Sequence, residues 1–137
     1  GDEPTYEPVK PGTVSEPGLI MFRYDAELFY ANVNRFVEDI QGLIESAPEP
    51  VEWLIIDASS LDSIDYSAGK ALEGMYQYLV SRKVQLVLAR VDTGLLQQMR
   101  EAGLADQLGE QYVFGNLVDA YNAFNNRPKP AGAAASS

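Results

Sequence analysis

Carboxylates and hydroxyls gather in one short stretch of the chain, directly after an apolar run. The side chains in this stretch that could do chemistry are Asp57, Ser59, Asp62, Asp65, Ser67 and Lys70. The preceding residues 51–56 predict a buried strand, and apolar residues at helical spacing resume after Ser67. Because sites in open α/β sheets are built beyond the carboxyl ends of the strands, this loop is the candidate functional site.

Ser67 stands where the helix is expected to begin. A serine there can cap the helix, its hydroxyl accepting a hydrogen bond from a backbone N–H two or three residues on. It can also be a site of phosphorylation, because a helix N-terminus attracts a phosphate through its dipole and its unpaired N–H groups. The nearby carboxylates would repel that phosphate, which adds about −1.5 to −2 charges. We therefore predict a cap or a switch at Ser67, and not a stable anion store.

The carboxylates of the loop allow other interpretations. Asp57, Asp62 and Asp65 could hold Mg²⁺, which prefers oxygen ligands; the interpretation that we favour is that Asp57 binds loop backbone and the other two are solvated. Lys70 could pair with Asp65 or Glu73, or it could receive a phosphate. The sequence has no glycine pattern of a phosphate-binding or dinucleotide-binding loop. We expect neither a bound cofactor nor a metal, although a nucleotide could bind weakly at the strand ends.

The composition excludes several classes of protein. The 137 residues contain no Cys and no His, which excludes disulfides, Cys/His zinc sites and catalytic systems built on a thiol or an imidazole. Asp and Glu number 20 against 10 Lys and Arg, a net charge of −10, so the basic surface that nucleic acids require is missing. We predict neither an enzyme nor a nucleic-acid-binding protein.

Strands and helices alternate along the chain. The apolar runs that predict strands are 19–24, 51–56, 84–89 and 112–114. The segments with helical spacing of apolar residues begin after Asn32, Ser67, Asp92 or Thr93, and Asn116. This alternation predicts an α/β fold with a mostly parallel sheet and right-handed crossovers.

The two ends of the chain differ from this pattern. Residues 1–17 are rich in proline and predict a linker, in which residues 5–9 could add an edge strand. Residues 127–137 have low complexity and predict a disordered tail, which leaves 18–126 as the domain. No apolar run is long enough for a membrane span. Because the chain starts at Gly1 without a Met, we expect a soluble piece cut from a longer protein.

Two stretches of the sequence resemble a known family. The first is Pro-Gly-Leu-Ile-Met-Phe-Arg-Tyr-Asp over 17–25 with Leu-Phe-Tyr-Ala-Asn over 28–32, and it is similar to the opening of the C-terminal STAS domain of SulP-type anion transporters. The second is Ile-Ile-Asp-Ala-Ser-Ser-Leu over 55–61 with Ile-Asp-Tyr-Ser-Ala-Gly-Lys over 64–70. It resembles the STAS signature, which anti-sigma-factor antagonists share.

The resemblance implies a fold and a regulatory function. The fold would be that of STAS domains, a mostly parallel sheet with helices chiefly on one face. The function would be that of a cytoplasmic domain of a sulfate or bicarbonate transporter, acting in folding, dimerisation, gating and partner docking. Its partners would be the transmembrane domain of the same transporter, at the inner face of the cell membrane, and a second copy of that transporter.

The resemblance also implies an alternative, a free-standing anti-sigma-factor antagonist that is switched by phosphorylation. Ser67 occupies the position that is phosphorylated in that branch. Two neighbours depart from the signature: Tyr66 stands where a small hydroxyl residue is usual, and Ala68 stands where glycine is usual.

Overall fold

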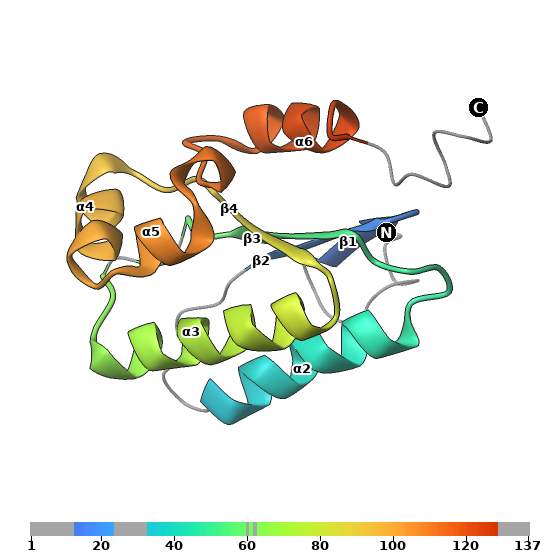
Figure 1. The fold of residues 1–137 in the computed structure, drawn as a ribbon, viewed down its shortest axis with the longest axis horizontal. Helices are drawn as coiled ribbons and strands as arrows, with labels where there is room; N and C mark the ends of the chain where they lie inside the picture. The colour runs from blue at the N-terminus through green and yellow to red at the C-terminus, as the bar shows by residue number, and fades with distance from the viewer. Residues whose placement is uncertain (1–12, 24–32, 60, 62, 129–137) are drawn as a thin grey trace, which may run out of the picture.

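A four-stranded sheet forms the centre of the molecule (Figure 1). The computed structural model describes residues 13–23, 33–59, 61 and 63–128. The strands, in their order across the sheet, are β1 (Thr13–Glu16), β2 (Leu19–Arg23), β3 (Trp53–Asp57) and β4 (Gln85–Ala89). β1 pairs antiparallel with β2, whereas β2, β3 and β4 are parallel. The prediction of a mostly parallel sheet is confirmed.

The helices cover the two faces of the sheet unequally. The elements that follow the strands are α2 (Val33–Ser46), α3 (Tyr66–Ser81), α4 (Thr93–Glu101), α5 (Leu104–Leu108) and α6 (Leu117–Asn125). In Figure 1, α2 and α3 run side by side along one face, and α6 lies across the other. Buried residues of α4 and α5 join the same core cluster as those of α2 and α3. Helices chiefly on one face, as predicted, are therefore confirmed.

The strand β3 divides the interior into two cores. All five of its residues are buried, because the sheet is covered on both sides. Leu54 and Ile56 belong to the larger core with α2, α3, α4 and α5. Trp53 and Ile55 point to the other face and pack with α6. The continuous apolar run in the sequence thus corresponds to a central strand.

Hydrogen bonds and an ion pair join α2 to α3. The hydroxyl of Tyr78 donates to Glu45 Oε2 at 2.8 Å, and Arg82 Nη2 donates to the same oxygen at 3.0 Å. Burial and the hydrogen bond to Glu45 raise the pKa of Tyr78. This cluster fixes the two helices relative to each other at the end where α3 terminates.

Most of the predicted boundaries agree with the structure. The strands predicted over 19–24, 51–56 and 84–89 are confirmed within two residues. Asp92 caps α4, its carboxylate accepting from Leu95 N at 2.8 Å, and Asn116 caps α6, its amide oxygen accepting from Asp119 N at 2.7 Å. Asn32, the predicted cap of α2, lies outside the described residues.

The strand predicted over 112–114 is wrong except for a single bridge. A 3₁₀ turn, η1 (Glu110–Tyr112), occupies its beginning, and only Val113 pairs with Leu88 of β4. The turn forms because Gly109 adopts a φ of +98° and its carbonyl accepts from Tyr112 N at 3.0 Å. The short helix α5 was also not predicted; it follows Gly103, which has a φ of +81°.

The ends of the described chain add two features to the predicted domain. β1 lies inside the segment assigned to the linker, whereas the edge strand expected at 5–9 lies outside the described residues. Arg127, which the sequence assigned to the tail, has a defined place: its side chain is only 11% exposed and forms an ion pair with Glu52. Residues 129–137 lie outside the described part.

Candidate functional site

The loop that the sequence singles out lies between the carboxyl end of β3 and the start of α3. β3 ends at Asp57, and residues 58–65 lead to the first helical residue, Tyr66. The backbone of this loop is held to the sheet, because Ala58 N donates to Ala89 O at 2.9 Å at the end of the neighbouring strand. Leu61 anchors it further, with a side chain that is buried in the larger core.

Asp57 is a buried carboxylate that stabilises the beginning of the loop. Its side chain faces the α6 side of the sheet, like Trp53 and Ile55. Its Oδ1 accepts a hydrogen bond from Ser59 N at 3.0 Å, and its Oδ2 lies 3.8 Å from Arg90 Nη1. Asp57 therefore binds loop backbone and has a cation as a second, looser neighbour.

Arg90 was not identified from the sequence. It follows β4 directly and adopts a φ of +60°, a left-handed conformation that is uncommon for residues other than glycine. Its guanidinium reaches the carboxyl end of β3, although its side chain is 49% exposed. No local sequence pattern predicts the positive φ of Arg90. Its proximity to Asp57 could not be predicted either, because the two residues stand at the ends of different strands.

Asp65, and not Ser67, caps α3. The carboxylate of Asp65 accepts from Ala68 N at 2.8 Å, and its backbone is extended, as expected of a capping residue. The helix begins at Tyr66, one residue earlier than predicted. The cap interpretation of Ser67 is therefore wrong: Ser67 already lies inside the helix, and Gly69 N, which a capping Ser67 could have bound, donates to the Asp65 carbonyl oxygen at 2.9 Å. The negative charge of Asp65 also suits the helix dipole.

Ser67 is the second residue of α3, and its side chain is exposed. Within the described part of the chain, its hydroxyl has no hydrogen-bond partner. Tyr66 beside it is 80% exposed, the largest exposure among the large apolar side chains described. A hydroxyl and an aromatic ring thus reach solvent together at the start of this helix.

Lys70 makes only surface contacts. Its Nζ lies 3.5 Å from Glu73 Oε1, with both side chains well exposed, and 5.8 Å from the centre of the Tyr66 ring. Exposed pairs of this kind contribute about 0–1 kcal/mol to stability. The pairing with Glu73 is one of the two that the sequence allowed; the pairing with Asp65 is not seen.

The remaining residues of the predicted site are only partly within the described structure. Ser59 has an exposed side chain, and Asp62 lies outside the described residues. Within the described ranges, no group of three or more acidic side chains is placed to hold a metal ion. The magnesium interpretation required Asp57, Asp62 and Asp65 together.

Gln98 is a residue of the site that the sequence did not reveal. Its side-chain oxygen accepts a hydrogen bond from Ile64 N at 2.7 Å, across 34 residues of sequence. Gln98 lies on α4, in a helical pattern whose glutamines are expected on the surface. Helical spacing places Gln98 three residues after the buried Leu95, at the flank of the buried face, whereas Gln97 is exposed; the spacing does not reveal which group Gln98 binds.

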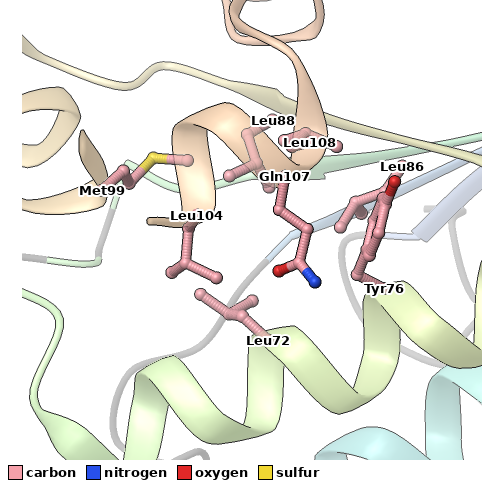
Figure 2. A pocket seen from close by; sticks show the side chains of 8 residues that line it. All are labelled: Leu72, Tyr76, Leu86, Leu88, Met99, Leu104, Gln107 and Leu108. Carbon is pink, nitrogen blue, oxygen red and sulfur yellow. The ribbon is translucent and has the colours of Figure 1, made fainter. Parts of the chain in front are cut away.

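Two hollows in the described structure lie away from this loop. The first is a partly open space of about 20 Å³ between α3, β4, α4 and α5. Figure 2 shows the side chains that line it. Its lining is almost entirely apolar: Leu72, Tyr76, Leu86, Leu88, Met99, Leu104, Gln107 and Leu108. A space of this size and polarity is a packing defect of the core rather than a ligand site. The second is an open hollow around Pro48 and Arg82, at the end of α2.

The amino ends of the strands carry a second cluster of charges. Arg127 Nε donates to Glu52 Oε1 at 2.8 Å, and its Nη1 donates to the carbonyl oxygen of Phe124 at 2.7 Å. The guanidinium also lies 3.8 Å from the centre of the Phe124 ring. Gly18, at a φ of +84°, completes the cluster: its carbonyl oxygen accepts from Glu52 N and Trp53 N, and an added Cβ would lie 3.3 Å from Glu52 Oε2.

No helix in the described part of the chain is long and apolar enough to cross a bilayer.

Known proteins share this fold and sequence pattern. A family model of the STAS domain matches residues 10–120. A probable sulfate transporter of Mycobacterium tuberculosis is 35% identical over 111 residues, which are 81% of this chain and 20% of the transporter. The chain thus spans about a fifth of the length of that relative.

Solved structures agree with the family model. The STAS domain of a SulP transporter from Vibrio cholerae has a TM-score of 0.69 at 20% identity, over 82% of this chain and 85% of that domain. A chain of the stressosome, which is described as a signal integration and transduction hub, has a TM-score of 0.69 at 19% identity, over 83% of this chain and 96% of that one. At these identities the likeness shows the fold. With the family model matching most of the sequence, the chain belongs to the STAS domain family.

Proposed function

We propose that this STAS domain is the cytoplasmic regulatory domain of a SulP-type anion transporter. In this role it contributes to folding, dimerisation, gating and partner docking, and it does not itself transport or catalyse. The observation that carries the proposal is the match to a fifth of a probable sulfate transporter. The remaining four-fifths of such a protein would supply the membrane-spanning part and the selectivity for sulfate or a related anion.

The loop between β3 and α3 is the proposed docking and switch point. Its beginning is fixed by Asp57 and its end is capped by Asp65, so the backbone is well held. Ser67 and Tyr66 project from that backbone into solvent. Ser59, Asp62 and Lys70 belong to the same proposed switch loop. A phosphate on Ser67 would be attracted by the helix N-terminus and repelled by the carboxylates, a balance that suits a switch.

The test is sulfate uptake by the full-length transporter that contains this domain. Ser67→Glu and Tyr66→Ala should each reduce the uptake rate several-fold at unchanged abundance in the membrane, because they alter the docking surface. Lys83→Ala, at the opposite end of α3, is the matched control and should leave uptake unchanged. If removal of the whole domain and both loop variants left uptake and abundance unaltered, the proposal would be refuted.

A second candidate function is partner switching by a free-standing protein of the anti-sigma-factor antagonist type. Two observations favour it: the likeness to a stressosome chain over 96% of that chain, and the exposed, unbonded hydroxyl of Ser67 among the described residues. The gene separates the candidates, since an open reading frame that begins near residue 1 without upstream membrane spans excludes the transporter. Incubation with a cognate serine kinase, followed by intact mass, tests the second: no added phosphate on Ser67 counts against it.

A further inference from the structure

Gln98 is a polar side chain on a helix that packs against the core. Its helical neighbours Leu95 and Met99 are 2% and 1% exposed, and Gln98 itself is half-buried. A polar side chain in such a place is expected to have a specific hydrogen-bond partner, because an unpaired one costs free energy. The partner of Gln98 is a backbone N–H of the candidate site.

The hydrogen bond fixes the loop just before the helix cap. Ile64 N donates to Gln98 Oε1 at 2.7 Å, and the Ile64 side chain packs against the larger core. Asp65 follows, with its carboxylate bound to Ala68 N at 2.8 Å. Ser67 therefore lies two residues after an anchored pair, in which Ile64 is held to α4 and Asp65 to α3.

The other side-chain hydrogen bonds described for the loop are local. Asp57 binds the backbone of Ser59, two residues away, and Asp65 binds that of Ala68, three residues away. Within the described ranges, Gln98 supplies the side-chain hydrogen bond that links residues 58–65 to a different helix. A local bond shapes the loop but does not fix its place in the domain. The backbone bond of Ala58 and the buried Leu61 hold the first half of the loop, and the bond to Gln98 holds the second half.

We propose that Gln98 is a positioning residue that holds the β3–α3 loop against α4 and thereby sets how Ser67 and Tyr66 are presented. A change at Ser67 then reaches α4 through the bond between Ile64 and Gln98. The inference rests on the proposed function, since presentation of Ser67 matters only where the loop is a docking or switch point. It adds α4 to that function as the element that senses the loop.

The direct test is to measure amide hydrogen exchange of the 137-residue chain by NMR. Gln98→Met keeps the length of the side chain and removes the acceptor, so the Ile64 amide should exchange roughly five- to tenfold faster, as expected for the loss of one hydrogen bond. Gln98→Glu keeps an acceptor oxygen and should restore slow exchange. Gln97→Met is the matched control, because Gln97 is exposed and its side chain donates to Glu101 on the same helix.

A second measurement follows the signal from Ser67. In the otherwise unchanged chain, Ser67→Glu should shift the amide resonances of α4 as well as those of the loop. In the Gln98→Met background, the shifts should stay within residues 59–70. Gln98→Asn, which is one methylene shorter and still polar, should act like Gln98→Met and provides a gentler change to the core.

The outcomes separate this inference from the proposed function. Unchanged Ile64 exchange in Gln98→Met, or equal shifts of α4 with and without Gln98, would overturn the positioning role. Gln98-dependent exchange and shifts, combined with no effect of Ser67→Glu on uptake, would instead refute the transport function of the loop and leave the coupling of loop and helix established.

Discussion

The two ends of the sheet each hold an arginine beside a carboxylate, with very different contacts. At the amino end, Arg127 lies 2.8 Å from Glu52, also binds a carbonyl oxygen, and is 11% exposed. At the carboxyl end, Arg90 lies 3.8 Å from Asp57 and is 49% exposed. The arginine at the first end is held inside the domain, whereas the arginine at the second end stays accessible to solvent.

The contrast indicates which end is available to a partner. The amino-end cluster fastens α6, the helix that covers the second face of the sheet, and α6 also reaches β1 through Tyr121, whose hydroxyl lies 3.2 Å from Glu16. The carboxyl-end loop is held through its backbone, while Ser67 and Tyr66 remain exposed. A region whose backbone is fixed and whose side chains are free is preorganised for binding. Under the proposed function, the amino end serves stability and the carboxyl end serves recognition.

The largest effect is expected at the amino end. Arg127→Met should lower the free energy of unfolding by about 2–3 kcal/mol, because it removes a well-shielded ion pair and a hydrogen bond to the Phe124 carbonyl. Urea unfolding measures the loss. Lys70→Met, which removes a cation from the exposed pair with Glu73, is the control and should change stability by less than about 0.5 kcal/mol. If Arg127→Met and Lys70→Met lowered the free energy of unfolding equally, the amino end would not be the more important end for stability.

Substitution of Asp57 tests what this buried carboxylate contributes at the carboxyl end of the sheet. Asp57→Ala should cost about 1–2 kcal/mol, because the Ser59 N–H loses its acceptor in a partly buried place. Arg90→Gly is the informative companion: it removes the cation, but glycine adopts the φ of +60° without the steric cost. We expect it to cost less than Asp57→Ala in the same urea titrations. A larger cost for Arg90→Gly would show that the ion pair, and not the backbone bond, holds this end.

The sequence predicts local features of this domain well and long-range contacts poorly. Asn116 was identified as a cap, and Asp92 as one of two candidates with Thr93, because a cap binds an N–H three residues on, within the same segment of sequence. The buried strands were found because apolar runs record burial on both faces. Both signals lie in neighbouring residues, so no knowledge of the tertiary fold is needed to read them.

The contacts that distinguish the two ends join distant residues. Arg127 and Glu52 are 75 residues apart, and Ile64 and Gln98 are 34 apart. Arg127 stands at the start of a low-complexity segment, so composition predicted disorder where an ion pair fixes the side chain. The cap of α3 was misplaced for a different reason: Asp65 and Ser67 are both good caps, and only the backbone geometry decides between them.

Substitutions of Asp65 measure how much the cap of α3 contributes to the stability of the domain. Asp65→Ala should lower the free energy of unfolding by about 1 kcal/mol, the usual cost of removing a capping side chain. Asp65→Asn keeps an oxygen that can accept from Ala68 N and should recover most of that loss. Urea titrations monitored by circular dichroism distinguish the variants. A loss of less than about 0.3 kcal/mol in Asp65→Ala would mean that this cap does not define the start of α3.

Ser67→Ala should have the smallest effect on stability. A small effect is informative, because it shows that the Ser67 hydroxyl does not cap α3. If its hydroxyl capped α3, Ser67→Ala would cost about 1 kcal/mol, as for Asp65→Ala. The structure gives the cap to Asp65 and leaves the Ser67 hydroxyl exposed, so we expect a change within about 0.5 kcal/mol. The two alanine variants, measured in the same urea titrations, therefore separate the residue that builds the helix start from the one that is available to a partner or a kinase. A cost for Ser67→Ala that matches the cost for Asp65→Ala would return Ser67 to a structural role and weaken its case as a switch.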